Sequence, residues 1–178
     1  MKAILNLHNT ILGGIAGKLE PWFLPTLARF TFAATLLVYF WNSAILKLGD
    51  GIFDISFNAY AQIFPVTFEA LGYDPDQLSL LHKLVAYAGT YAEFILPALL
   101  LIGLFTRLAA LGMVGFVAVQ TFVDITGHHA DETTIGAWFE RIPDSLIMDQ
   151  RLFWFAILMV LFTRGGGPLS VDRFIGLK

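Results

Sequence analysis

The chain has 178 residues, of which 57% are hydrophobic and 14% charged, with a formal net charge of −3 and a mean hydropathy of +0.70. About a quarter of the residues in an ordinary soluble domain are charged, so this chain has too few charged side chains to cover a water-facing surface. The composition excludes that class and indicates an integral membrane protein. No linker-like tract divides the sequence, which predicts a single membrane domain over residues 1–178.

The first 20 residues predict a helix on the membrane surface rather than a signal peptide. Apolar residues recur there at helical spacing, at Ile4, Leu7, Ile11, Ile15 and Leu19. Lys2, Asn9 and Lys18 lie off that stripe, which is the pattern of an amphipathic surface helix. Polar residues interrupt the apolar run, and no small-residue cleavage site follows it. Pro21 and Pro25 are then expected to turn the chain into the membrane.

Four later segments are apolar and long enough to cross a hydrocarbon core about 30 Å thick, which takes about 20 helical residues. They cover residues 23–46, 80–103, 106–126 and 147–163, and the last is the shortest. Gly103, Leu104 and Phe105 leave only a tight turn between the second and third spans, so these two helices must be adjacent and antiparallel. The predicted fold class is therefore all-α membrane, a four-transmembrane-helix up-down bundle with an amphipathic N-terminal helix.

Basic residues predict the orientation, because short loops rich in Lys and Arg stay in the cytoplasm. Seven lie on the side of the two termini: Lys2, Lys18, Arg29, Arg107, Arg164, Arg173 and Lys178. Four lie on the opposite side: Lys47, Lys83, Arg141 and Arg151. We therefore expect a multi-pass protein of the bacterial cytoplasmic (inner) membrane, with both termini in the cytoplasm.

The two outer loops and the tail are expected to carry interfacial helices. An aromatic stripe in the first loop, formed by Phe57, Tyr60, Phe64, Phe68 and Leu71, suits the membrane interface. The second loop carries Trp138 and Phe139 in a short segment. These loops either cap the bundle's outer end, or wall an outer cavity or dock a partner. In the interfacial tail, residues 164–178, Ser170 is expected to cap a short helix with Asp172 in its first turn.

Glu93 is the exceptional residue within the spans, because a charge at the bilayer centre costs about 2.5–3.5 kcal/mol even on the lenient insertion scale. Helical rise places it about 16 Å below the outer boundary, near the midplane, and Gln120 and Asn42 could join it in one polar cluster. Pro97 lacks the N–H that would bond the Glu93 carbonyl, so we expect a kink and a free oxygen there. The acid either contacts a proton, ion or ligand, or only holds the bundle together.

Histidines form a second candidate site at the outer ends of the helices. His82, His128 and His129 lie there, with Asp124 one turn before His128. Imidazole and carboxylate groups suit copper, zinc or iron, and paired histidines from two helices also hold b-type haem. The alternative is an ordinary solvated loop. Cysteine is absent from the sequence, which excludes disulfide relays, thiolate metal ligation and iron–sulfur clusters.

Three stretches of the sequence resemble the DoxX/DoxD-like family of membrane proteins. ARFTFAATLLVYFWNSAILKLGDG resembles its first helix, EFILPALLLIGLFTRLAAL its second and third helices, and RGGGPLSVDRFIG its closing motif. The positions that match the family pattern are Arg29, Lys47, Glu93, Arg107, Gly167, Pro168, Ser170 and Asp172. The resemblance implies a fold of four membrane helices.

Relatives in that family include subunits of a thiosulfate:quinone oxidoreductase and proteins of oxidative-stress or metal-related membrane complexes. By association, the leading hypothesis is a membrane subunit or quinone-contacting component of a redox system, in which Glu93 relays a proton with support from Arg29, Gln120 and Asn42. If the protein is an enzyme, it is then a quinone-linked oxidoreductase subunit. The alternative is a non-enzymatic membrane anchor or small transporter in metal or oxidant homeostasis. The expected partners are the bilayer, a redox or metal-handling protein or a second copy of the chain, and no nucleic acid.

Overall fold

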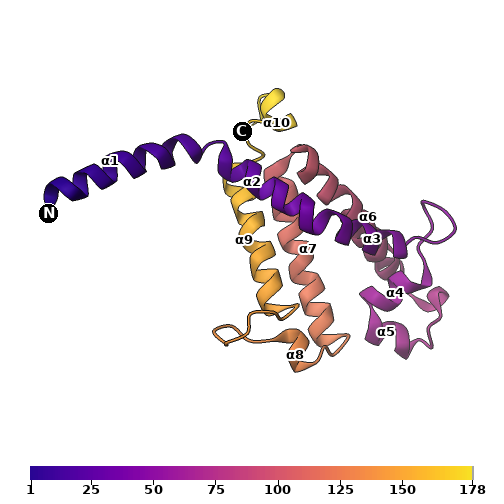
Figure 1. The fold of residues 1–178 in the computed structure, drawn as a ribbon. Helices are drawn as coiled ribbons and strands as arrows, with labels where there is room; N and C mark the ends of the chain where they lie inside the picture. Colours follow the sequence, from indigo (N-terminus) through magenta and orange to yellow (C-terminus); the bar gives the residue numbers. More distant parts are fainter. Residues whose placement is uncertain (178) are drawn as a thin grey trace.

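A computed structural model of the chain describes residues 1–177 and is helical throughout its regular parts (Figure 1). The elements are α1 (Lys2–Leu19), α2 (Phe23–Phe32), η1 (Ala33–Leu37), α3 (Val38–Leu46), α4 (Phe57–Ile63), α5 (Pro65–Ala70), η2 (Pro75–Gln77), α6 (Leu80–Ile102), α7 (Thr106–Thr126), α8 (Glu132–Ile135), α9 (Met148–Arg164) and α10 (Val171–Phe174). We call the end of the bundle with the α6–α7 turn and α10 the terminal end, and the end with α4, α5 and α8 the loop end. Lys178 of the predicted tail lies outside the described residues.

Three helical segments are long and apolar enough to cross a membrane, and they coincide with the first three predicted spans: Phe23–Leu46, Leu80–Ile102 and Thr106–Thr126. The first is continuous through α2, η1 and α3, and η1 is a single π-helical turn, a feature that often marks functional regions of helices. The fourth predicted span corresponds to α9, which has 17 residues. The structure is thus an all-helical membrane protein, and the count of four spans stays a prediction.

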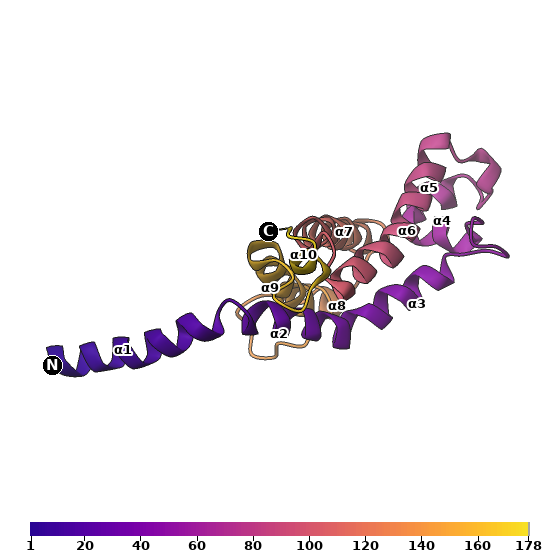
Figure 2. The ribbon, with the colours of Figure 1, turned by 90° about the horizontal axis from the view of Figure 1, so that it is seen from above.

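Helix α1 extends away from the bundle, as Figures 1 and 2 show from two directions. None of its residues is buried, and Ile4, Leu7, Ile11 and Ile15 each expose about half or more of their surface. A helix with an unpartnered apolar stripe is suited to the membrane surface. Its position on that surface stays a prediction.

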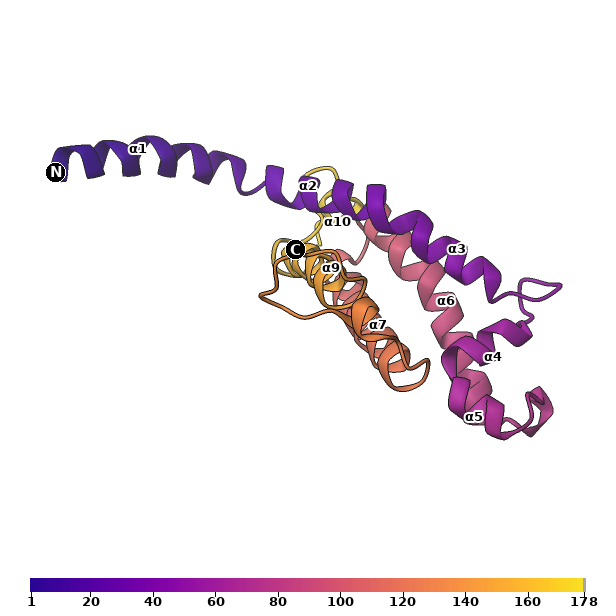
Figure 3. The same cartoon turned by 60° about the horizontal axis from the view of Figure 1, so that its bottom comes forward.

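The spans form two helix pairs that meet at the terminal end. α3 packs against α6, and α7 packs against α9 (Figure 3). The pairs are joined because α6 also packs against α7 and because α2 contacts both α9 and α6. The core between them contains Phe32, Leu36, Phe40, Leu100, Met113, Leu158 and Leu161, all nearly fully buried. Phe40 lies at its loop-end edge and packs edge-on against Phe116 and Trp154. Close side-chain packing of this kind holds membrane helices together, because lipid is as apolar as their side chains.

The first loop folds back on the bundle instead of lying in the interface as a single aromatic stripe. Pro65 begins a new helix, so the predicted stripe is divided between α4 and α5. Phe68 and Tyr60 are buried with Ala86 of α6 in a second apolar cluster. The prediction of an interfacial helix was wrong for these two aromatic residues, because they pack against one another and against α6.

The second loop carries only the short helix α8. Asp131 caps it by accepting hydrogen bonds from Thr133 and Thr134. These bonds, that from the Thr133 side chain first, hold the pKa of the Asp131 carboxyl group well below its ordinary value. Trp138 donates its indole N–H to the Met148 carbonyl at the start of α9. The loop is therefore fastened to the outermost turn of α9.

Candidate functional site

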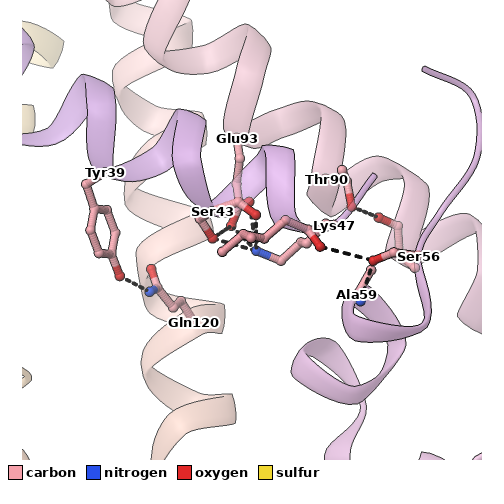
Figure 4. A network of polar contacts seen from close by, with 10 residues as sticks. Tyr39, Ser43, Lys47, Ser56, Ala59, Thr90, Glu93 and Gln120 are labelled. Atoms are coloured by element: carbon pink, nitrogen blue, oxygen red, sulfur yellow. Dashed lines mark hydrogen bonds and ion pairs between the residues drawn. The ribbon is translucent and has the colours of Figure 1, made fainter. Parts of the chain in front are cut away.

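Glu93 forms a buried ion pair with Lys47, which is the C-cap residue of α3. The Lys47 Nζ lies 2.8 Å from Glu93 Oε2 and 3.0 Å from Oε1. Ser43, one turn earlier on α3, donates its hydroxyl to Glu93 at 3.3 Å and accepts from Lys47 at 2.6 Å. Figure 4 shows the three side chains pointing toward one another from α3 and α6.

Pairing lowers the free-energy cost of burying these two charged groups. Lys47 is 5% exposed and Glu93 is 4% exposed, and either charge alone would be costly at this depth. Paired and hydrogen-bonded, the two groups are neutral as a unit. The family-pattern residues Lys47 and Glu93 therefore belong to one site, whereas the sequence alone had placed Lys47 only at the outer end of its helix.

Pro97 lies one turn after Glu93 and is fully buried, and α6 continues through it as one helix of 23 residues. The residue cannot donate a backbone hydrogen bond to the Glu93 carbonyl. The neighbouring Phe94 carbonyl accepts a hydrogen bond from the Trp41 indole at 3.2 Å. Trp41 thereby ties α3 to this part of α6, just beside the ion pair.

A cavity of about 470 Å³ adjoins the ion pair between α3, α6 and α7. Its walls are mostly apolar, and small residues such as Gly89, Ala92 and Gly112 form part of them. Gln62 and Ile63 of α4 line it at the loop end. We call this space the crevice. Its polar lining consists of Tyr39, Ser43, Lys47, Gln62, Glu93, Gln120, Asp124 and His128. A large apolar cavity with a few converging polar groups is the usual form of a small-molecule site.

Gln120 lines the crevice from α7 and donates its side-chain amide to the Tyr39 hydroxyl at 2.9 Å (Figure 4). Within residues 1–177, its buried Oε1 atom has no hydrogen-bond partner. Tyr39 also lines a second cavity of about 500 Å³, nearer the loop end between η1, α7 and α9. Asp124 and His128 border both spaces. The Tyr39–Gln120 hydrogen bond thus lies beside a boundary between two cavities.

Arg151 of α9 is a functional candidate that the sequence did not single out. Its guanidinium group pairs with Asp124 and donates to Thr121 at 2.7 Å. It also lies 6.0 Å from the ring centre of Trp154. Its buried Nε has no hydrogen-bond partner in the described chain. The one available signal was an arginine in the first turn of an apolar segment, and its partner Asp124 was assigned instead to the histidine group.

The structure does not bring Arg29 or Asn42 to Glu93. Arg29 donates to the carbonyls of Leu100 and Leu101, about 10 Å along α6 from Glu93 by helical rise. Asn42 is exposed on α3 and does not line the crevice. Neither residue therefore belongs to the polar cluster that the sequence suggested, because helix facing separates Asn42 and depth separates Arg29 from the acid.

The four predicted metal ligands are also dispersed. The His82 ring forms a hydrogen bond with the hydroxyl of Ser79, the N-cap residue of α6, and packs edge-on against Phe64. The His128 ring contacts the Gln62 carbonyl. Asp124 is engaged by Arg151. In residues 1–177, no group of three or more histidine and acidic side chains is placed to hold a metal ion. The predicted set of His82, Asp124, His128 and His129 is therefore not assembled as a metal centre.

The remaining residues of the family pattern lie together at the terminal end, in a cluster that we call the clasp. Arg29 also donates to the carbonyls of Gly166 and Leu169 at 2.9 Å, and Arg107 donates to those of Phe162 and Thr163 at the end of α9. The Asp172 carboxylate accepts the backbone N–H groups of Phe105 and Thr106 at 2.7 and 2.8 Å. These contacts fill helix-end groups that otherwise lack partners.

The turn at Gly103 shows why the clasp needs particular small residues. Its φ of +71° is left-handed, and an added Cβ would lie 2.5 Å from the Ser170 Cβ. Ser170 caps α10 and donates to the Gly167 carbonyl at 2.6 Å. Gly167 has a φ of +75° and packs close to Pro25, and Pro168 follows it. The closing motif thus has a structural role at the α6–α7 turn.

Comparison with known proteins supports the family resemblance. No curated protein and no solved structure matched the chain. The family model described as DoxX matches residues 24–126, which include Lys47, Glu93 and the lining of the crevice from α3, α6 and α7 but neither α9 nor the closing motif. Because this match covers more than half of the 178 residues, the chain belongs to the DoxX family.

Proposed function

We propose that this DoxX protein binds the headgroup of a lipid-soluble quinone in the crevice and serves as the quinone-contacting membrane component of a redox system. The observation that carries the proposal is a buried Lys47–Glu93 pair bordering an apolar cavity of about 470 Å³ between membrane-spanning helices. Such a space admits a planar ring with small substituents, and its apolar walls suit a ligand that arrives from the bilayer.

The polar groups of the crevice match the two forms of a quinone. The Lys47 ammonium group carries three N–H donors and can donate to a carbonyl oxygen of the oxidised ring. The Glu93 carboxylate and the Gln120 amide oxygen are acceptors for the hydroxyl groups of the reduced ring. One pair of side chains thus contacts the ligand before and after reduction.

Reduction of a quinone to a quinol takes two electrons and two protons. We propose that a partner protein carrying a redox centre supplies the electrons. We propose that two protons from water pass to the ring oxygens through Lys47 and Glu93, whose Nζ and Oε2 atoms lie 2.8 Å apart. A cationic N–H next to the ring also stabilises the negative charge that develops on its oxygen.

We also propose a membrane topology for the chain. We place α9 as a fourth span, so that the chain crosses a bacterial inner membrane four times with both termini in the cytoplasm. The distribution of basic side chains supports this orientation, since Arg29, Arg107, Arg164 and Arg173 gather at the terminal end.

A second candidate function is membrane anchoring of a partner protein without chemistry in this chain. The observation that favours it is the exposure of α1, since none of the 18 residues of this helix is buried. Anchoring requires no ligand in the crevice, so a measurement of quinone binding distinguishes the two candidate functions.

Binding is tested by titrating purified protein in detergent with a short-tailed quinone and following tryptophan fluorescence. The double substitution K47Q/E93Q removes both charges together and avoids leaving one buried charge alone. We expect it to weaken binding at least about tenfold, the loss of a charged hydrogen bond. The matched control, Glu69→Gln, removes an exposed acid of α5 and should bind as wild type does. Equal affinity in the double variant and the wild type would contradict the proposal.

A further inference from the structure

A third cavity, lined by charged residues, lies at the terminal end, away from the crevice. It has a volume of about 580 Å³ and lies between the start of α2, the α6–α7 turn, the end of α9 and α10. Arginines from three elements line it: Arg107 of α7, Arg164 of α9 and Arg173 of α10. We propose that this cavity binds the phosphate headgroup of an anionic phospholipid. The inference does not depend on what the crevice binds.

The charge balance of the cavity favours an anion. Its one acidic lining residue is Asp172, whose two carboxylate oxygens already accept backbone N–H groups at the start of α7. Arg164 pairs with Glu20, but both side chains remain more than 40% exposed. With Glu20 counted, three guanidinium groups face two carboxylates that are both engaged, which leaves a net charge of +1. Guanidinium is the side chain best suited to hold a phosphate by paired hydrogen bonds.

Arg107 is the most fixed of the three. One of its terminal nitrogens, Nη1, donates to the carbonyls of Phe162 and Thr163 at 3.1 and 2.9 Å. Its Nη2 and Nε make no hydrogen bond to another described residue, and its Nε lies beside Gly165. In addition, the buried Thr106 hydroxyl lines the cavity and has no partner among residues 1–177. The Nη2 and Nε atoms of Arg107 therefore supply hydrogen-bonding capacity that the described residues leave unused, while the Thr106 hydroxyl, at 0% exposure, is enclosed beside them.

The surroundings favour a lipid rather than a free anion. Trp22, Phe105 and Leu108 line the same cavity and are each about half exposed or more. The cavity also lies where three membrane-spanning segments begin or end, at the level of lipid headgroups. Basic pockets between helices at that level hold anionic headgroups, while neighbouring apolar and tryptophan side chains contact the acyl region.

Native mass spectrometry of detergent-purified protein tests the proposal by counting bound phosphatidylglycerol against bound phosphatidylcholine. We expect R164Q/R173Q to lower the affinity for phosphatidylglycerol at least about tenfold, because two charge-assisted contacts are lost. The matched control K2Q/K18Q removes the same charge from α1, outside the cavity, and should leave affinity within about twofold, as expected for distant surface charges. Thermal unfolding of each variant checks that it is folded.

Three results would overturn the proposal. One is an equal loss of lipid in K2Q/K18Q, which would reduce the effect to general surface charge. Another is unchanged binding in R164Q/R173Q. The last is displacement of the lipid by millimolar inorganic phosphate alone, which would assign the cavity to a free anion. A quinone titration of R164Q/R173Q should match wild type, so failure here is distinguishable from failure of the crevice proposal.

Discussion

The two ends of the bundle use their polar groups differently, although the terminal end also has one buried polar atom, Thr106 Oγ1, without a hydrogen-bond partner among residues 1–177. At the terminal end, Arg29, Arg107 and Asp172 hydrogen-bond carbonyl and N–H groups of three helices, α6, α7 and α9, and of the loop after α9. Toward the loop end, a buried ion pair borders the crevice, and buried atoms of Gln120 and Arg151 have no hydrogen-bond partner among residues 1–177. Buried polar groups without partners are rare in folded proteins and need an explanation. The comparison teaches that the family pattern combines structural residues at one end with ligand-binding candidates nearer the other.

The two ends of the bundle differ because the connections at the two ends of α6 and α7 differ in length. α6 and α7 are joined by only Gly103, Leu104 and Phe105, so they are held in contact at the terminal end. Toward the loop end, α6 follows the long α4–α5 segment and α7 leads into α8, and the crevice lies between them. The short connection holds α6 and α7 in contact at one end, and the long connections leave room for the crevice between them toward the other.

The largest effect is expected for Arg29→Gln, which breaks the clasp. Arg29 makes four hydrogen bonds to carbonyl groups in two segments, and each bond from a charged donor is worth about 1.5–3 kcal/mol. Because four such bonds are lost, we expect the free energy of unfolding in micelles to fall by about 6 kcal/mol or more. Protein that remains folded should bind quinone with wild-type affinity. Wild-type stability together with loss of quinone binding would instead indicate that Arg29 belongs to the quinone site.

The second effect concerns the ion pair. Glu93→Gln leaves a buried, unpaired ammonium group, and Lys47→Gln leaves a buried, unpaired carboxylate, so each should destabilise the protein by about 3–5 kcal/mol. The double variant K47Q/E93Q should lose less than the sum of the single losses, because neither charge remains. Denaturant unfolding of the four proteins gives the coupling energy. Additive losses would show that the two charges are not energetically paired.

The sequence was sufficient to predict the membrane-spanning segments and the depth of their polar residues. It was much less informative about the direction in which each side chain points from its helix. The hydropathy of residues 23–46, 80–103 and 106–126 was enough to find three spans, and Glu93 was recognisable because an acid near mid-bilayer is costly. Asn42 was placed near it by depth alone, whereas its contacts depend on rotation about the helix axis. Arg29 was named as a supporting residue, but it lies at another depth and bonds the end of α6. Lys47 was overlooked as a partner, because its side chain reaches back along α3 by a full turn to Ser43. Arg151 was missed because its partner Asp124 comes from another helix.

Access from water should differ between the two ends, and the cysteine-free sequence allows single reporter thiols. Ser43→Cys lies in the wall of the crevice, and Ala110→Cys lies in the closed core with 0% exposure. A small thiol reagent should react with the first at least about tenfold faster, because reaction needs an exposed thiolate. Equal rates would remove the contrast between an open and a closed region.

The smallest effect is expected for Asn42→Leu. The side chain is exposed on α3 and outside the crevice lining, so the change should alter unfolding free energy by no more than about 0.5 kcal/mol. Quinone affinity should also be unchanged. A loss of binding measured by the fluorescence titration would place Asn42 in the site after all.

The most direct test of the central claim is photo-crosslinking with an azido-quinone, followed by mass spectrometry of the labelled peptides. The account predicts label on residues lining the crevice in α6 and α7, from Val85 to Leu96 and from Gly112 to Asp124. It also predicts that the label is lost in K47Q/E93Q and retained in Glu69→Gln. Label confined to α9 or to the terminal end, or unchanged label in the double variant, would contradict the assignment of the crevice as the quinone site.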